Sequence, residues 1–578
     1  MTRTESDPPR IPAKITLALI AIASLAGILR FSGLDYLLPL VIEPDPHIAG
    51  QVRTIETGLP SISESDDWPK YPLLPAQLTV LTSDPIPLPA KSAPLAEHLD
   101  AAMNPILRVR KTIAWLSLLL VPAGWLLARR FMSDTWALPA AYLAGMSLLA
   151  IHFGTQARPH AAAAAFPALT VVACMRLARA PTIKNYLLVT LAGALAIGFL
   201  QSAVALGFPV FVAHLLGGRS FRHQLKLLIP SLGLLLSLYL FSPFLFDSPD
   251  LTRSGGNIGL GGHEMFLNTF RGGGIPTILR TLSGWEPALG AGALIALAYT
   301  LRERLTTGLA QHTRNERRIA LAYVLPYLLV IGLNPRTYER FVLPLVPFLA
   351  TWSIWALYRM HSSGSRRLAL SLTAMMCLIP TVAGVKLCML RSRPTTLDLA
   401  SDWLVSNAAD PAEPVYIFRP NTLPLFKTEE STELDEADNK LSDNWQLDWT
   451  GYQRDHLQGR QQEQAWNLRF SPMSRKHKRV AQMGSDPTGY LQSLEDGKLL
   501  VLEVYENRRV LQEFSILTET ARDSYLKVAE FKPGPPMEIP LRYQDITRPT
   551  APSFFLQVLR AQSFGPPLEI FALDRKIQ

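Results

Sequence analysis

Cysteine and charge are both scarce in this sequence. Its 578 residues include three cysteines, all in or beside apolar runs, which indicate neither a disulfide framework nor a cysteine-based zinc site. Charged residues make up 18% of the chain, below the roughly 25% of an ordinary globular domain. Hydrophobic residues make up 48% and are concentrated in residues 1–390, whereas residues 391–578 have the composition of a soluble protein. These features exclude an all-soluble enzyme, a disordered chain and a fibrous repeat.

Nucleotide-binding motifs are absent as well. The sequence has no P-loop and no Gly-x-Gly-x-x-Gly after an expected strand, which argues against an ATP-driven pump. Short tandem repeats are also absent. Most basic residues of the apolar half fall in short turns, so charge and composition indicate no nucleic-acid partner.

Long apolar runs dominate the first two thirds of the chain. A membrane span needs about 20 mostly apolar residues to cross roughly 30 Å of hydrocarbon. The candidates number about eleven, at residues 14–34, 111–128, 135–153, 160–178, 185–200, 202–217, 226–246, 286–301, 319–334, 341–358 and 368–389. The pair 185–200 and 202–217 is short, so one bent or re-entrant element is an alternative there. The first run has features of a signal peptide, but it continues to about Leu40, which favours an uncleaved span.

Basic residues support this count through the positive-inside rule. With the N-terminus inside, every expected inner turn is basic: Arg3, Arg10 and Lys14; Arg129 and Arg130; Arg176, Arg179 and Lys184; Arg219, Arg222 and Lys226; Arg302, Arg304, Arg314, Arg317 and Arg318; Arg366 and Arg367. The exception is Arg108, Arg110 and Lys111, before the second span. An odd number of spans predicts an integral protein of the plasma (inner) membrane with a cytoplasmic N-terminus and an extracytoplasmic C-terminal domain.

The expected fold class is therefore a polytopic α-helical membrane protein with a C-terminal extracytoplasmic α/β domain. Residues 1–390 form the membrane module, which includes a first outer loop, 35–110, and a glycine-rich outer loop, 247–285. Residues 391–578 form the soluble domain. Its signals are a helical stretch, Thr395–Ser406, and strand-like runs at Pro414–Phe418, Lys498–Tyr505 and Leu568–Leu573.

The first outer loop carries two carboxylates next to the end of the first span. Glu43, Asp45 and His47 alternate with Pro44 and Pro46, and the prolines predict an extended chain. Side chains two residues apart in an extended chain share a face, so the three are expected to point toward one pocket. Burial of a carboxylate near a membrane surface costs free energy unless the carboxylate is paired with a partner or has a functional role. A solvated acidic loop is the alternative interpretation.

Two further outer segments carry candidate site residues. Lys70 and Tyr71 lead into an apolar stretch, Leu73–Leu81, which is typical of an interfacial helix, with simple loop packing as the alternative. The glycine-rich stretch 253–274 has little intrinsic order and contains His263 and Glu264. It is expected either to close over a substrate or to act as a flexible linker.

Several segments resemble the GT-C superfamily of membrane glycosyltransferases, above all protein O-mannosyltransferases and the aminoarabinose transferase of lipid A. The matching segments, in family order, are "EPDPH" (43–47), "YPLLP" (71–75), "ARPHAAAAAF" (157–166), "NPRTYERFVLPLVPF" (334–348) and "LDLASDWLVSN" (397–407). Two positions depart from the family pattern, since Pro46 stands where a Glu is usual and His160 stands where many members have Asp.

The resemblance implies a glycosyltransferase that moves a sugar from a polyprenyl-phosphate-linked donor to an extracytoplasmic glycan, lipid or protein acceptor. An acceptor hydroxyl needs a general base, which we assign to Asp45, with Glu43 as a second carboxylate. One carboxylate and a lipid-phosphate leaving group favour an inverting displacement over a retaining one. Cations and hydrogen-bond donors stabilise the leaving phosphate. The candidates for this role are Arg158, Arg340, Lys70 and Tyr71. Snorkelling of the arginines to anionic lipid head groups is the alternative.

The remaining candidates are assigned to the substrate pocket: His47, His160, His263 and Glu264. Asp45, His47 and His160 also offer oxygen and nitrogen ligands, so a divalent metal is possible. Hydrogen-bonded pocket histidines are favoured, and no obligatory metal or cofactor is expected. Membrane lipids are expected partners. A transporter or lipid flippase, and a catalytically inactive GT-C-like scaffold, are the alternative functions.

Overall fold

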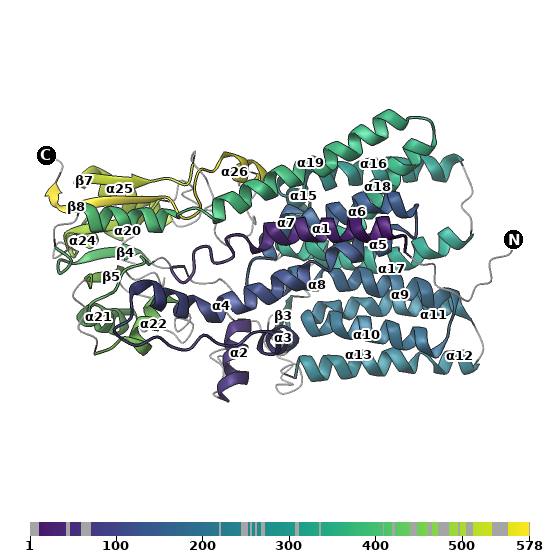
Figure 1. Cartoon of the computed structure of the whole chain (residues 1–578), viewed down its shortest axis with the longest axis horizontal. Helices are drawn as coiled ribbons and strands as arrows, with labels where there is room; N and C mark the ends of the chain where they lie inside the picture. The colour runs from purple at the N-terminus through teal and green to yellow at the C-terminus, as the bar shows by residue number, and fades with distance from the viewer. Residues whose placement is uncertain are drawn as a thin grey trace. The chain divides into compact units, whose positions relative to one another are not determined.

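A computed structural model gives the fold of the chain (Figure 1). It describes residues 11–41, 47–58, 71–218, 221–243, 253–254, 257–260, 263–266, 272–306, 311–334, 337–407, 410–418, 422–439, 448–459, 465–471, 485–494, 497–504, 512–534 and 553–576. The chain divides into two compact units. Unit 1 comprises Met1–Phe31, Pro69–Pro75 and Thr112–Val385, and unit 2 comprises Ser32–Trp68, Ala76–Lys111 and Lys386–Gln578.

Unit 1 is built of helices. They are α1 (Ala13–Phe31), α5 (Leu120–Ala128), α6 (Asp134–Met146), α7 (Leu148–Phe153), α8 (His160–Ala163), α9 (Ala165–Arg179), α10 (Ile183–Phe199), η2 (Gln201–Leu206), α11 (Gly207–Gly217), α12 (Phe221–Leu225), α13 (Leu228–Phe241), α15 (Gly274–Gly284), α16 (Pro287–Thr306), α17 (Gln311–Leu333), η4 (Glu339–Leu345) and α18 (Val346–Ser362). Helices α4 (Leu95–Ser117) and α19 (Arg366–Arg391) contribute to both units. Helices α9, α10 and α13 lie side by side (Figure 1).

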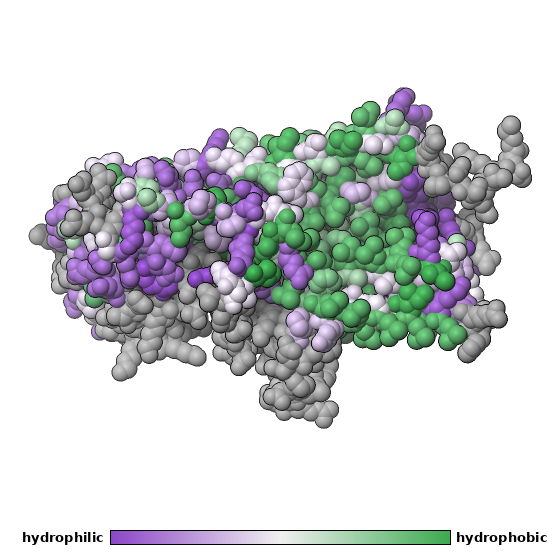
Figure 2. Space-filling model, turned by 60° about the horizontal axis from the view of Figure 1, so that its bottom comes forward, coloured by the Kyte–Doolittle hydropathy of each residue, from purple (hydrophilic) through white to green (hydrophobic). Residues whose placement is uncertain are grey.

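A helix lies on each of the predicted spans, and the described residues include six helices long and apolar enough to cross a membrane. These are Ala13–Phe31, Leu95–Ala128, His160–Arg179, His223–Phe241, Glu339–Ser362 and Arg366–Asn407. Hydrophobic residues gather on the surface of the unit 1 helices (Figure 2). On α13, for example, Leu232 and Leu235 are each more than half exposed, as expected of side chains that face lipid. The protein is thus a largely helical membrane protein, and the count of eleven spans stays a prediction.

Two predicted spans differ in detail from a straight helix. The run 135–153 is broken into α6 and α7 at Ser147, which has φ −49° and ψ 125°. The pair 185–200 and 202–217 forms separate helices, because Leu200 is extended between α10 and η2.

The glycine-rich stretch is more ordered than predicted. Strands β1 (Arg253–Ser254), β2 (Asn257–Leu260) and β3 (His263–Phe266) form an antiparallel sheet, and α15 begins at Gly274. The prediction of little intrinsic order is wrong at these segments, because backbone hydrogen bonds between strands need no side chains.

Unit 2 contains a five-stranded mixed sheet in the order β5-β4-β6-β8-β7. Strand β4 (Val415–Phe418) is parallel to β5 (Leu468–Ser471) and β6 (Leu499–Glu503), whereas β8 (Leu568–Lys576) is antiparallel to β6 and β7 (Tyr525–Phe531). The predicted strands fall on β4, β6 and β8. Strand β6 is buried along its whole length, which explains its continuous apolar run.

Helices accompany this sheet. They are α20 (Thr396–Asn407), α21 (Glu429–Asn439), α22 (Trp449–His456), α24 (Pro487–Gln492), α25 (Gln512–Ser524) and α26 (Phe554–Arg560). Helix α20 matches the predicted helical stretch. Tyr490, Leu500, Leu517 and Phe571 are fully buried in one hydrophobic cluster, which joins α24 and α25 to the sheet.

Most of the first loop packs in unit 2, as α2 (His47–Thr57), α3 (Leu74–Thr82) and the start of α4. The amide nitrogen of Trp449 donates to the Pro39 carbonyl at 3.0 Å, and His98 Nδ1 lies 3.1 Å from the Tyr452 hydroxyl. The two units therefore differ from a division of the chain at residue 390. Hydropathy indicates whether a segment is suited to lipid or to water, but it does not show which other residues the segment contacts.

Candidate functional site

Four predicted site residues that are far apart in the sequence lie together in unit 1. The Tyr71 and His160 rings meet edge-on with centroids 5.9 Å apart, and the His160 ring stacks on Phe341 at 6.0 Å. Arg158 and Arg340 both act electrostatically on His160. We call Tyr71, Arg158, His160, Arg340 and Phe341 the His160 cluster.

Local sequence explains why these side chains are held in place. Pro159, with φ −73°, precedes the first residue of α8, where the fixed φ of proline suits a helix start. Arg340 and Phe341 belong to the short 3-10 helix η4, which follows the extended residue Tyr338. The cluster therefore depends on two short segments, the start of α8 and the 3-10 helix η4. Some backbone amides at such helix starts have no partner within the helix.

The cluster is rich in positive charge. Arg158 and His160 are each 5% exposed. The Arg340 guanidinium carbon lies 4.2 Å from the Tyr338 ring centroid and 5.4 Å from that of Phe341. Stacking on aromatic faces holds the planar guanidinium in one orientation. A buried guanidinium and a second one held by stacking are suited to bind an anion with several oxygens, such as a phosphate.

His160 adds a polar group to the cluster. Its Nδ1 atom is buried and has no hydrogen-bond partner among the residues that the structure describes. A buried polar atom of this kind gains when a ligand supplies the missing hydrogen bond. The His160 cluster can thus both hold an anion and make a hydrogen bond to the group attached to it.

For five other predicted site residues, the structure gives no side-chain geometry. Glu43, Asp45 and Lys70 lie outside the described residues. His263 and Glu264 occupy β3 positions that pair with Leu260 and Gly259, and only their backbone is described. The positions of these five residues in a site stay predictions.

His47 requires a correction. It is buried in unit 2 and begins helix α2, so the extended chain predicted through residues 43–47 does not include His47. The prolines end at residue 46, and the amphipathic sequence after them favours a helix.

No group of three or more His, Cys, Asp or Glu side chains within the described ranges is arranged to hold a metal ion. Asp45 and Glu43 are not among those residues, so the expectation of no obligatory metal stays a prediction.

Sequence reasoning missed the aromatic residues that support Arg340. Tyr338 and Phe341 flank it at positions −2 and +1 in the run "TYERF". An arginine between aromatic residues, next to a proline-rich helix start, was the signal that could have found them.

The comparisons with known proteins agree with this picture over part of the chain. Residues 101–246 match the family model of dolichyl-phosphate-mannose-protein mannosyltransferase. The match confirms the resemblance to GT-C glycosyltransferases that the sequence motifs predict, and the matched segment includes Arg158 and His160. No curated protein matches the chain significantly.

Solved structures of membrane glycosyltransferases were also found. The archaeal oligosaccharyltransferase AglB from Archaeoglobus fulgidus, in complex with an inhibitory peptide and a dolichol-phosphate, has 11% identity and a TM-score of 0.46, over 94% of this chain and 77% of AglB. ArnT from Cupriavidus metallidurans, bound to undecaprenyl phosphate, has 12% identity and a TM-score of 0.45, over 85% of this chain and 94% of ArnT. Both TM-scores lie below 0.5, too low for either likeness to bear on the activity.

Proposed function

We propose that the protein transfers a sugar from a polyprenyl-phosphate-linked donor to an acceptor outside the cytoplasm. The observation that carries the proposal is the His160 cluster, in which the buried His160 ring stacks on Phe341, next to the Arg340 guanidinium, and interacts electrostatically with Arg158 and Arg340. Arg158 and His160 fall inside the segment that matches a lipid-phosphate-dependent mannosyltransferase model, which supports the same chemistry.

The proposed reaction is a single displacement at the anomeric carbon. The acceptor hydroxyl attacks this carbon while the bond from the carbon to the phosphate oxygen breaks, so the configuration inverts. The proton of the hydroxyl goes to Asp45, the general base, and Glu43 orients the acceptor or the base. The departing lipid phosphate keeps the electron pair, and Arg158 and Arg340 stabilise its negative charge; Lys70 and Tyr71 are proposed as further hydrogen-bond donors to it.

The distribution of basic residues supports an acceptor on the extracytoplasmic side of the membrane. The basic inner turns assign the C-terminal residues and the first loop to the extracytoplasmic side. The donor is accordingly one that already carries its sugar on a lipid at that side, which suits a chain without a recognised nucleotide motif. His47, His263 and Glu264 are proposed to contact the acceptor or the sugar.

The first prediction concerns Asp45. Asp45→Asn should lower sugar transfer by about 10²–10⁴-fold, because the amide cannot take the proton of the acceptor hydroxyl. Donor binding should persist, since the amide keeps the size of the carboxylate. The measurement pairs turnover of a labelled polyprenyl-phosphate sugar in nanodiscs with native mass spectrometry of the lipids that co-purify with the protein.

The matched control is Asp35→Asn, which changes an exposed carboxylate in the same loop and should leave transfer unaltered. A polyprenyl-phosphate sugar retained by Asp45→Asn, with bare polyprenyl phosphate on the unaltered protein, would name the donor. Full transfer by Asp45→Asn would remove Asp45 as the base. Ordinary phospholipids alone on both proteins, with no turnover, would overturn glycosyl transfer.

A further inference from the structure

Unit 2 contains a pocket that the proposed reaction does not use. Its cavity volume is about 150 Å³, roughly that of a cavity that holds one six-membered ring, and it is partly open to solvent. Among the described residues it is lined by Lys427, Thr428, Glu429, Thr432, Gln453, Leu457, Gln458 and Ala465. The walls come from the start of α21, the end of α22 and the segments next to them.

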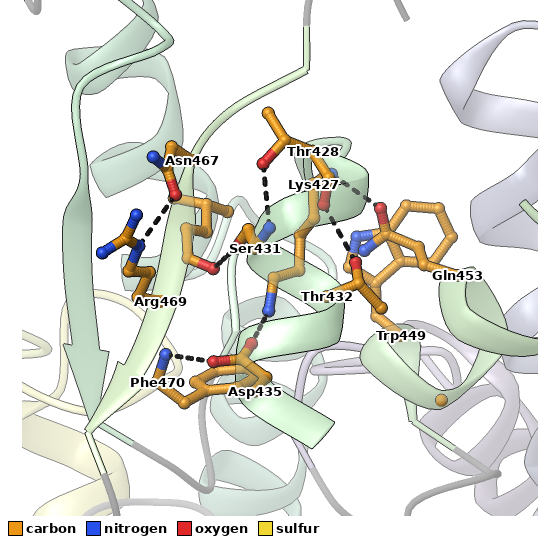
Figure 3. Close-up of polar contacts among 12 residues, drawn as sticks. Lys427, Thr428, Ser431, Thr432, Asp435, Trp449, Gln453, Asn467, Arg469 and Phe470 are labelled. Atoms are coloured by element: carbon orange, nitrogen blue, oxygen red, sulfur yellow. Dashed lines mark hydrogen bonds and ion pairs between the residues drawn. The ribbon is translucent and has the colours of Figure 1, made fainter. Parts of the chain in front are cut away.

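The one ammonium group in this lining is already neutralised. Lys427 Nζ forms an ion pair with Asp435 and lies 4.2 Å from the centroid of the Phe470 ring (Figure 3). The other Asp435 oxygen accepts the Phe470 amide at 2.8 Å. Because Lys427 and Asp435 are both buried and paired, the described lining of the pocket offers no spare cation to a phosphate.

The amide of Gln453 has a fixed orientation. Its Oε1 atom accepts the backbone N–H of Lys427 at 2.8 Å, and a backbone N–H can only donate (Figure 3). The Nε2 group is therefore a donor, and the described residues provide no hydrogen-bond acceptor for it, although Gln453 is only 3% exposed. Such an atom is expected to have a partner, which an occupant of the pocket would supply.

Two threonine hydroxyls add to the polar lining, which also includes Glu429 and Gln458. Thr432 donates its hydroxyl to the Thr428 carbonyl at 3.1 Å and keeps lone pairs to accept a hydrogen bond. The Thr428 hydroxyl accepts the Ser431 amide at 3.2 Å and keeps its hydrogen to donate. Leu457 and Ala465 add apolar surface. The described lining thus combines neutral donors and acceptors, one carboxylate that can accept hydrogen bonds, and apolar surface. This combination suits a molecule whose hydroxyls both donate and accept and whose ring carbons are apolar.

We propose that this pocket binds a neutral sugar residue of the acceptor, so that the acceptor is a glycan or a glycolipid. The inference rests on the proposed function, because it assigns the pocket to the acceptor of that reaction. It differs from the proposed donor site in chemistry: the His160 cluster has two cations to hold a phosphate, whereas the described residues of the pocket in unit 2 have none to spare.

The test measures binding of the full-length protein in nanodiscs to an array of neutral mono- and disaccharides. The unaltered protein should bind a subset of them. Thr432→Val removes one hydroxyl with little change of shape, and Gln453→Glu keeps the acceptor for the Lys427 amide but removes the donor. Each variant should weaken saccharide binding by about 10-fold or more, since each leaves a ligand hydroxyl without its partner.

Thr450→Val is the matched control. Thr450 is buried in α22, does not line the pocket, and has a hydroxyl without a hydrogen-bond partner among the described residues. This variant should bind saccharides like the unaltered protein. Thermal unfolding of each variant shows whether a loss of binding reflects a loss of folding, and Thr432→Val and Gln453→Glu should unfold within a few degrees of the control.

Co-purifying donor lipid separates this inference from the proposed function. Retained polyprenyl-phosphate sugar with lost saccharide binding in Thr432→Val and Gln453→Glu supports the pocket. Donor lipid on the unaltered protein without binding to any saccharide, or with binding to peptides only, overturns the pocket and leaves the transferase proposal standing. Saccharide binding without any donor lipid or turnover overturns the transferase proposal, and with it the role of the pocket in acceptor binding.

Discussion

At the scale of single residues, the orientation of Arg340 matters as much as its charge. Its guanidinium stacks on Tyr338 and Phe341, and Phe341 also stacks on His160. Arg340→Met should lower kcat by about 10²–10³-fold, because the variant loses a donor aimed at the departing phosphate. Arg340→Lys should have a kcat between those of the unaltered protein and Arg340→Met, since an ammonium keeps the charge but not the planar guanidinium. Steady-state turnover at several donor concentrations separates kcat from KM.

Arg317 provides the control for this substitution. Its guanidinium carbon lies 4.5 Å from the Trp355 ring centroid, the same kind of contact in the same unit, but Arg317 lies near the start of α17, at an end that the charge pattern predicts to be cytoplasmic. Arg317→Met should leave kcat within about twofold once folding has been verified. An Arg340→Met protein as active as Arg317→Met would assign Arg340 to lipid head groups, the alternative that the sequence leaves open.

The sequence could predict four of the five members of the His160 cluster, all but Phe341, and it could not predict their arrangement. Tyr71, Arg158, His160 and Arg340 were found separately, from motifs on three segments. Their proximity depends on how helix ends pack, which no local pattern specifies. The stacking of Arg340 on its neighbours depends on the 3-10 helix η4. The sequence of η4 is equally compatible with the start of a straight α-helix, so the stacking could not be predicted.

At the scale of elements, the break between α6 and α7 is held by polar contacts that hydropathy does not detect. The Ser147 hydroxyl donates to Glu286 Oε1 at 2.5 Å, and Glu286 also accepts the Leu149 amide at 2.8 Å. Ser147 in turn accepts the Ala150 amide and caps α7. The apolar run predicted a single span over 135–153, because one serine barely changes its mean hydropathy.

Ser147→Ala should therefore destabilise unit 1 by about 1–3 kcal/mol, because it removes one of the two donors to Glu286 Oε1 and the side-chain cap of α7. Thr351→Val is the comparison: Thr351 is also buried, but its hydroxyl has no hydrogen-bond partner among the described residues. Its loss should change stability by less than about 0.5 kcal/mol. Thermal unfolding in the same detergent compares the two variants, and equal melting temperatures would show that the Ser147 contacts contribute little.

Two of the three basic residues that break the positive-inside pattern have an explanation at this scale, whereas Lys111 is exposed. Arg108 forms an ion pair with Glu56 at 2.6 Å, and Arg110 donates to the carbonyls of Leu34 and Tyr36 at 2.8 and 3.0 Å. These guanidinium groups are used inside unit 2 and are not available to anionic lipids. A rule based on exposed charge therefore does not apply to them, and the sequence alone could not show that they are buried.

At the scale of the whole molecule, composition predicted a helical membrane part and an α/β part, but not which residues belong to each unit. Most of residues 32–111 packs with the C-terminal sheet, through contacts such as the Lys91 ammonium to the Gln458 carbonyl at 2.6 Å. Such pairing between segments more than 300 residues apart leaves no trace in hydropathy. Polar loops and a soluble tail look alike in composition whether they pack together or apart.

Sidedness is the last prediction, because the proposed reaction requires the first loop and the tail to face away from the cytoplasm. Single cysteines placed in a variant without Cys174, Cys377 and Cys388 report it. Ser363→Cys, exposed beside the basic turn Arg366–Arg367, should react with a membrane-impermeant maleimide only after the cells are permeabilised. Ser406→Cys, exposed in α20, should react in intact cells. Labelling of both positions only after permeabilisation would place the tail in the cytoplasm. The span count would then be even, and the acceptor would have to be sought on the cytoplasmic side.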